Sequence, residues 1–165
     1  MAEESLRHWE IREVDYDDPD AVTLRDDLQR FYVERYGGPD DAPVNPDDFR
    51  PPHGACFVGY LAGEPVAAGY WHSLAVDRLG TSELVELKRV HVIAAQRRRG
   101  FAQRLIAELE RTALAAGHKA AVLSTGLRQP EAIALYKRLG YEAIEGFGHY
   151  ADDSNVTFLG RRLSP

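Results

Sequence analysis

Arg97-Arg98-Arg99-Gly100-Phe101-Ala102 is the stretch that decides the fold, because of the segments on either side of it. Before it, residues 84–93 form a long run with β-branched residues toward its end, which predicts a strand. After it, apolar residues recur at steps of three and four as far as Gly117, which predicts an amphipathic helix with a glycine at its end. A strand, a basic loop and a helix start therefore follow one another here.

This loop has the properties of an anion-binding site. A helix start presents backbone N–H groups without intrahelical acceptors and a partial positive charge, so it suits phosphate. Arg97, Arg98 and Arg99 add cationic side chains, Gly100 lets a ligand approach the backbone, and Ala102 keeps the first turn uncrowded. Taken alone, these residues are equally well interpreted as a solvated basic loop.

Two other phosphate motifs compete with this interpretation. The P-loop pattern G-x-x-x-x-G-K-[ST] does not occur in the sequence. Gly146-Phe147-Gly148-His149-Tyr150-Ala151 fits a loose G-x-G-x-x-A, but a dinucleotide-binding loop would need a following helix and acidic residue. We interpret this segment as a glycine-rich turn between strands.

The remaining pattern predicts one α/β domain over residues 1–165. Alternation and turn residues predict strands at 6–14, 55–61, 66–74, 120–124, 141–144 and 156–163. Two further helices are expected, one from Asp18-Pro19 to Gly37-Gly38 and one from Pro130 to Gly140. The order is strand–helix–strand–strand–strand–helix–strand–helix–strand–strand, with residues 37–52 as a long surface loop.

The composition excludes several classes of protein. The 165 residues carry a net charge of -6, whereas a nucleic-acid module is expected to carry a basic face. Cys56 is the single cysteine and the six histidines are scattered, so neither a disulfide framework nor a metal site is expected. Without an apolar N-terminal segment or a run of about 20 apolar residues, we expect a cytoplasmic protein that does not enter a membrane.

Two blocks of sequence together resemble a known family. Arg97 to Ala102 matches the R/Q-x-x-G-x-G/A signature of the GNAT superfamily of N-acetyltransferases, and Glu86-Leu87-Lys88-Arg89-Val90-His91-Val92 looks like the fourth strand of that fold. Downstream, Pro130 to Tyr141 resembles its A-x-x-L-Y-x-x-x-G-F/Y block, in the same order and at a similar separation. Many members carry Asn early in this block, where Gln129-Pro130-Glu131 stands in this chain.

The resemblance implies a fold and a cofactor. The GNAT fold is a single mixed, mostly antiparallel central sheet whose fourth and fifth strands are parallel and splay apart to admit acetyl-CoA. Carried over, the backbone of Val90, His91 and Val92 would bind the pantetheine arm. The backbone amides of Arg97, Arg98, Arg99, Gly100, Phe101 and Ala102 would bind the pyrophosphate. No metal is implied.

It also implies two catalytic residues. Tyr136 would lie near the thioester sulfur, and a phenol with a pKa of about 10 is protonated and can donate to a leaving thiolate. From periodicity alone, Tyr136 is instead interpreted as a core residue. Glu86 is the candidate base, since an alkylammonium with a pKa of about 10.4 must lose a proton before attack, directly or through water.

Alternatives to Glu86 remain open. By alternation, Glu86, Lys88, Val90 and Val92 share one face of the strand, so Lys88 could pair with Glu86 on an exposed face and lower its basicity. His72 and His91 are second-rank bases, and lone strand histidines are more often structural.

The acceptor is expected to be bound by residues 18–52, 72–83 and 142–155. These segments include His149, Tyr150 and eight aspartates, which suit a small cationic amine: Asp26, Asp27, Asp40, Asp41, Asp47, Asp48, Asp152 and Asp153. A protein lysine or N-terminus is the alternative acceptor, and a CoA-binding regulatory module without turnover is the alternative function. Because GNAT proteins are often dimers, the resemblance also suggests a homodimer.

Overall fold

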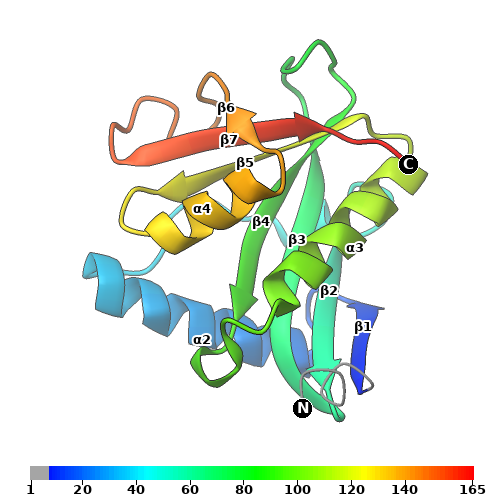
Figure 1. The fold of residues 1–165 in the computed structure, drawn as a ribbon, viewed down its shortest axis with the longest axis vertical. Coiled ribbons are helices and arrows are strands. Elements are labelled where there is room, and N and C mark those ends of the chain that lie inside the picture. Colours follow the sequence, from blue (N-terminus) through cyan, green and yellow to red (C-terminus); the bar gives the residue numbers. More distant parts are fainter. Residues whose placement is uncertain (1–7) are drawn as a thin grey trace.

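The computed structural model describes residues 8–165, in which seven strands form one sheet in the order β1-β2-β3-β4-β5-β7-β6 (Figure 1). The strands are β1 (Trp9–Val14), β2 (Gly54–Leu61), β3 (Glu64–Leu74), β4 (Leu84–Val92), β5 (Ala120–Gly126), β6 (Glu142–Ala143) and β7 (Val156–Arg162). The α-helices are α2 (Pro19–Tyr36), α3 (Phe101–Ala115) and α4 (Pro130–Arg138), and the 3₁₀ helices are η1 (Pro46–Phe49) and η2 (Ala94–Gln96). This is the predicted order of strands and α-helices.

The β4–β5 pair is parallel and short, whereas the other neighbouring strands pair antiparallel. Only Leu84–Glu86 of β4 pair with Ala120–Val122 of β5. Beyond Glu86 and Val122 the ladder ends, so the two strands part. The predicted parallel, splayed fourth and fifth strands are confirmed.

The helices cover both faces of the sheet. Alternate residues of β2 point to opposite faces and so show which helices pack on which face. Ala55 and Phe57 join the apolar cluster that contains the inward side chains of α3 and Tyr136 of α4. Cys56 and Val58 join the cluster on the opposite face, with Ala21 and Leu24 of α2. Figure 1 shows α3 and α4 in front of the sheet. We call these the α3 face and the α2 face.

The ends of α2 follow from its sequence. The Asp18 side chain accepts hydrogen bonds from the backbone N–H groups of Asp20 and Ala21, and Pro19 occupies the first turn. At the other end Gly37 adopts a left-handed conformation with φ 81°, and its N–H donates to the Val33 carbonyl. Both predicted boundaries of this helix are confirmed.

A β-bulge in the β3–β4 pair changes which residues share a face. The register shifts between Ala68 and Tyr70 of β3, and Arg89 of β4 has φ 52°, a left-handed conformation that is uncommon for arginine. The predicted alternation was wrong as a result. Val90 and Val92 pack on the α3 face, because one extra residue moves every later side chain to the other side.

Two further segments differ from the prediction. The strand expected at 141–144 has only two residues, and the 37–52 loop contains the unpredicted η1. Residues 6 and 7 of the first predicted strand lie outside the described residues.

Candidate active site

The loop before α3 leaves backbone N–H groups open. Arg98 and Gly100 have positive φ angles of 62° and 82°, and α3 starts at Phe101 without a side-chain cap. Within residues 8–165, no acceptor is found for the N–H groups of Phe101 and Ala102. A Cβ placed on Gly100 would meet no atom within 4 Å. Unpaired amides therefore border open space at a helix N-terminus, as an anion site requires.

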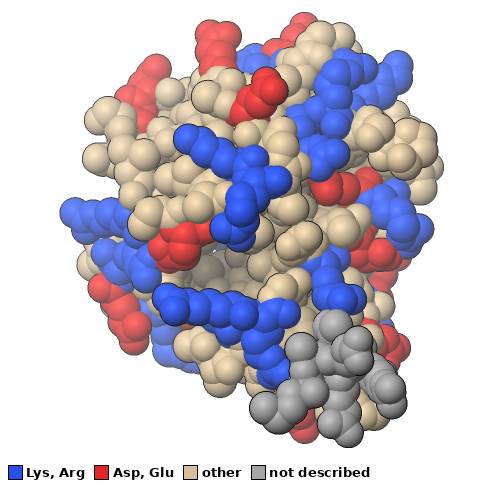
Figure 2. Space-filling view, viewed as in Figure 1, with Lys and Arg blue, Asp and Glu red and all other residues tan. Residues whose placement is uncertain are grey.

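Two of the three arginines in this loop hold it in shape. The Nε of Arg97 donates to the Val92 carbonyl at 3.0 Å, and its guanidinium lies 5.0 Å from the Phe31 ring centroid. Arg99 hydrogen-bonds Gln96 and lies over the Phe101 ring. Figure 2 shows basic side chains on both sides of a hollow on the face that carries α3 and α4. This face combines a recess with positive charge.

Phe101 has a structural side chain. It is 2% exposed and stacks on Trp9, with ring centroids 4.5 Å apart. A ligand at this position would therefore meet only its backbone. Val90 and Val92 likewise direct their side chains into the α3 face, and on the β5 side their backbone makes no ladder.

Tyr136 lies on α4, where it is 7% exposed in the core of the α3 face. Its ring packs edge-on against Tyr141 at 5.3 Å. Burial raises the pKa of Tyr136 well above the usual value near 10, and the neighbouring Tyr32 and Glu110 raise it further. No residue in the described part of the chain forms a hydrogen bond with its hydroxyl group, so this group is available as a donor.

Glu86 occupies the last paired position of β4 before the strands part. Its carboxylate is buried, with Oε1 2.8 Å from Nε2 of His72 and 4.0 Å from Nζ of Lys88. The ion pair with Lys88 that was left open is present, but the alternative that places it on an exposed face is wrong, because Glu86 is buried. The close partner is His72, which lies opposite Glu86 on β3.

His91 is a structural link between β4 and α2. Its Nε2 lies 2.7 Å from Oδ2 of Asp27, and the residue is 6% exposed. Burial lowers the pKa of His91, which favours the neutral imidazole. The backbone role predicted for His91 is independent of this side-chain contact.

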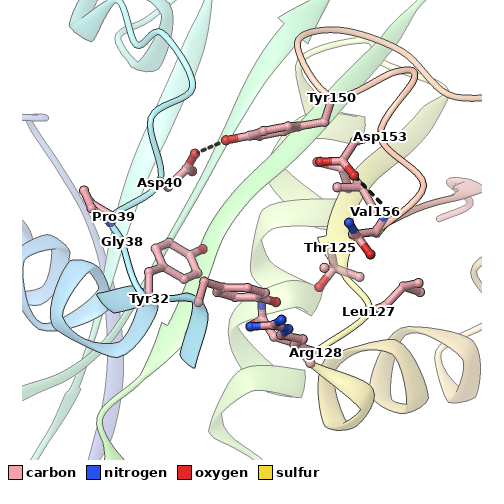
Figure 3. A pocket seen from close by; sticks show the side chains of 15 residues that line it. Tyr32, Gly38, Pro39, Asp40, Thr125, Leu127, Arg128, Tyr150, Asp153 and Val156 are labelled. Atoms are coloured by element: carbon pink, nitrogen blue, oxygen red, sulfur yellow. Dashed lines mark hydrogen bonds between the residues drawn. The ribbon is translucent and has the colours of Figure 1, made fainter. Parts of the chain in front are cut away.

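A pocket of about 430 Å³ opens on the α2 face, beside the diverging end of β5 (Figure 3). Part of its lining comes from the first and third segments expected to bind the acceptor, whereas the segment 72–83 contributes no lining residue. Residues 124–129 and Val156 also line it and were not expected. Its walls come from the end of α2, the loop that follows it, the end of β5 and the β6–β7 loop: Tyr32, Tyr36, Gly38, Pro39, Asp40, Ser124, Thr125, Gly126, Leu127, Arg128, Gln129, Tyr150, Asp153, Asn155 and Val156.

Two loops meet across this pocket. The hydroxyl of Tyr150 lies 2.8 Å from Oδ1 of Asp40 and 2.9 Å from Oδ1 of Asp41 (Figure 3 draws the first contact). His149 packs edge-on against the Tyr150 ring, with Nε2 3.9 Å from Oδ1 of Asp41. Of the eight aspartates, Asp40 and Asp153 line the pocket. The contact closes one side of the pocket and places carboxylates there.

The structure also gives a role to the residues that replace the usual Asn. Nε2 of Gln129 donates to the Tyr36 hydroxyl at 3.0 Å, and Glu131 forms an ion pair with Arg35. Both contacts tie the start of α4 to the end of α2. Tyr32 and Tyr36 were missed at the sequence level, although their spacing of four residues in a predicted helix places them on one face.

Comparison with known proteins decides the family. The model of the acetyltransferase (GNAT) family matches residues 21–141, which is most of the chain. The chain belongs to the GNAT family of acetyltransferases. As a GNAT acetyltransferase it depends on acetyl-CoA as the acetyl donor.

Individual relatives agree with this assignment. An IAA acetyltransferase from Azospirillum brasilense is 29% identical over 143 residues, covering 87% of this chain and 90% of the relative. A solved structure from Klebsiella pneumoniae subsp. pneumoniae, named as an acyl-CoA N-acyltransferase, superposes with a TM-score of 0.75 at 25% identity, covering 94% and 98% of the two chains. A Salmonella typhimurium GNAT neighbour, solved with its cofactor acetyl-CoA, has a TM-score of 0.69 at 18% identity, covering 95% of each chain.

Residues 8–165 carry neither a membrane-spanning helix nor a metal cluster. None of the helices there is both long and apolar enough to cross a membrane. Nor does that part of the chain contain a group of three or more His, Cys, Asp or Glu residues that could hold a metal ion.

Proposed function

We propose that residues 1–165 form one N-acetyltransferase domain that moves an acetyl group from acetyl-CoA to the primary amine of a small cationic molecule. One observation carries this proposal. β4 and β5 part beyond Glu86 and Val122, with Tyr136 on the α3 face of the opening and the 430 Å³ pocket on the α2 face. A donor and an acceptor could meet in the opening from opposite faces.

The residues around the opening fit the cofactor. The unpaired edge of β4 offers the backbone of Val90, His91 and Val92 to the pantetheine amides. The loop from Arg97 to Ala102 offers N–H groups and open space at Gly100 to the pyrophosphate. In this proposal the three arginines contribute mainly through their backbone and their positive field.

The chemistry requires two proton transfers. Acetyl-CoA supplies an activated acyl group as a thioester. The acceptor nitrogen forms a bond to the carbonyl carbon while the carbon–sulfur bond breaks. Tyr136 donates its hydroxyl proton to the departing sulfur, and Glu86, through water, takes a proton from the amine. The products are the acetamide and the free thiol. Solvent takes the second proton of the nitrogen and the proton held by Glu86, and it returns one proton to the phenol, so one proton is released for each ammonium acetylated.

The pocket supports a small acceptor that carries a positive charge. Its volume lies within the range typical of small-molecule sites. Asp40 and Asp153 line it, and Asp41 lies beside it at Tyr150. Carboxylates in a recess attract an ammonium group and raise its local concentration. The contact between Tyr150 and Asp40 narrows the pocket, which favours a small molecule over a protein segment.

A thiol-release assay tests the proposal. The protein is incubated with acetyl-CoA and a panel of primary amines, amino acids and lysine-containing peptides, and free CoA is measured. We expect release with small cationic amines. Release only with peptides would favour the protein-lysine alternative. Absence of release across the panel, together with calorimetric binding of CoA, would favour a CoA-binding regulatory module.

Two properties of the whole protein complete the proposal. We expect a cytoplasmic protein, and a homodimer in solution, as is common in the family. Light scattering coupled to size-exclusion chromatography measures the second property directly.

A further inference from the structure

Arg89 is a buried arginine at the point where β4 and β5 have parted. It lies three residues beyond Glu86, in the β-bulge, with a φ angle of 52°. Its side chain is only 10% exposed. Burying a guanidinium costs free energy unless hydrogen-bond acceptors replace the lost water.

The described residues do not supply those acceptors. The Nε of Arg89 is fully buried without a hydrogen-bond partner among them. The nearest carboxylate oxygen is Oδ2 of Asp40, 3.9 Å from Nη2, which is beyond hydrogen-bond distance. A guanidinium has five N–H donors in a planar fork. In this guanidinium the buried Nε is therefore unsatisfied, and Nη2 makes only a long ion pair with Asp40.

Arg89 is not itself among the residues that line the acceptor pocket, but its neighbours Asp40 and Tyr32 are. Asp40 lines the pocket, and its Oδ1 already accepts from Tyr150 at 2.8 Å and from the N–H of Ala42 at 3.0 Å. Tyr32 also lines the pocket. The pKa of Tyr32 is raised to about 12, chiefly by burial and then by Asp40, and Arg89 opposes this rise, so the guanidinium lies within electrostatic reach of the phenol. Figure 3 shows Asp40 and Tyr32 on the same wall of the pocket.

We propose that Arg89 binds a carboxylate of the acceptor, so the acceptor is an amine that also carries a carboxylate. The inference rests on the proposed function and narrows its substrate class. The planar fork of arginine matches a carboxylate through two parallel hydrogen bonds. A phosphate, with its higher charge, would be repelled by Asp40, whereas a singly charged carboxylate would be repelled less. A diamino acid such as lysine or ornithine satisfies both the cationic and the carboxylate requirements.

Matched acceptor pairs test the inference in the wild-type protein. L-lysine is compared with L-lysinamide and cadaverine, and L-ornithine with putrescine, by kcat/KM for thiol release. We expect each amino acid to be used roughly 10- to 100-fold better than its partner without a carboxylate, the effect of charge-assisted hydrogen bonds. The amide is a demanding control. The α-amino group of lysinamide, with a pKa of about 8, is neutral more often than that of lysine, which lies beside a carboxylate. A neutral amine is the reactive form, so intrinsic reactivity favours the amide.

Variants show whether Arg89 is responsible. Arg89→Gln should lower the acid-to-amide ratio toward one, and Arg89→Lys should retain part of it. Arg111→Gln is the matched control, since Arg111 is an exposed residue of α3 paired only with Glu108. Calorimetric titration of L-lysine and L-lysinamide into the CoA-bound protein gives the same comparison without turnover.

Three results would overturn the inference. The wild type could use cadaverine as well as lysine. Alternatively, the acid-to-amide ratio could survive in Arg89→Gln while its melting temperature falls, which would make Arg89 only a structural partner of Asp40. A loss of CoA affinity in Arg89→Gln, without a change in the ratio, would assign the residue to the donor. If no amine releases thiol, the proposed function fails, and the titration still decides whether Arg89 recognises a carboxylate.

Discussion

Nε2 of His72 lies 2.8 Å from Oε1 of Glu86, while Nδ1 of the same ring lies 2.9 Å from the Ser73 carbonyl. The two contacts fix the orientation of the His72 ring against the carboxylate. His72 and Glu86 therefore form one hydrogen-bonded unit at the point where the strands part.

Glu86→Gln tests this unit. The amide cannot take a proton from the amine, so we expect kcat/KM at pH 7 to fall by about 100-fold. Near pH 10 roughly a third of an amine with a pKa of about 10.4 is already neutral, so the deficit should shrink. The measurement is a pH–rate profile of both proteins with one amine.

Glu83→Gln is the control, because Glu83 precedes β4 and forms an exposed pair with Lys119. It should behave like the wild type. A deficit of Glu86→Gln that is constant from pH 6 to 10 would mean that Glu86 has a structural role only.

Tyr136→Phe tests the general acid. Loss of the hydroxyl removes the proton for the leaving sulfur and leaves the ring packing against Tyr141 in place. We expect kcat to fall by roughly 100-fold with little change in CoA affinity or melting temperature. Tyr60→Phe, which removes only a hydroxyl that donates to Asp20, is the matched control. Equal kcat values in the two variants would count against Tyr136.

The alkaline side of the pH profile gives a separate test of Tyr136. Burial raises its pKa well above 10, and the protonated phenol is the active donor. A raised pKa moves the loss of the active form to higher pH. The wild type should therefore keep its kcat up to pH 10. A fall in kcat centred below pH 10, absent from Tyr136→Phe, would contradict this expectation.

Gly100→Ala tests the cofactor loop. Gly100 has φ 82° at the start of α3, and alanine in that conformation costs about 1 kcal/mol or more. The added methyl group would also enter the space in front of the unpaired N–H groups. We expect the Kd for CoA to rise roughly 10-fold, measured by calorimetry.

Gly63→Ala separates strain from binding. Gly63 also has φ 82° and lies in the β2–β3 turn, where an added methyl group would meet no atom within 4 Å. Both variants should lose similar stability, and only Gly100→Ala should bind CoA more weakly. Equal Kd values would remove Gly100 from the proposed site.

Phe101→Ala should affect stability rather than cofactor binding. The buried ring stacks on Trp9, and truncation of a buried phenylalanine typically costs 3–5 kcal/mol. Urea unfolding would measure this loss. Where the variant remains folded, its Kd for CoA should match that of the wild type within about threefold, since only the Phe101 backbone faces the proposed ligand. A large rise in Kd without loss of stability would show that the ring itself binds CoA.

Local sequence determined the order of the strands and α-helices and the loop at the proposed cofactor site. The start of α2 is set by Asp18 and Pro19, and its end is set by Gly37. The basic loop that ends in Gly100 precedes α3, which starts without a side-chain cap. Such signals depend on neighbouring residues in the chain, so they can be read without the fold.

Only the tertiary structure decided which residues meet across the sheet and around the pocket. The bulge at Arg89 moved Val90 and Val92 to the other face, and no local pattern marks one extra residue in a ladder. His72 meets Glu86 across two strands, and Tyr150 meets Asp40 across 110 residues. These partners depend on strand register and loop packing, which long-range contacts determine. The buried Nε of Arg89, which has no hydrogen-bond partner among the described residues, became visible for the same reason.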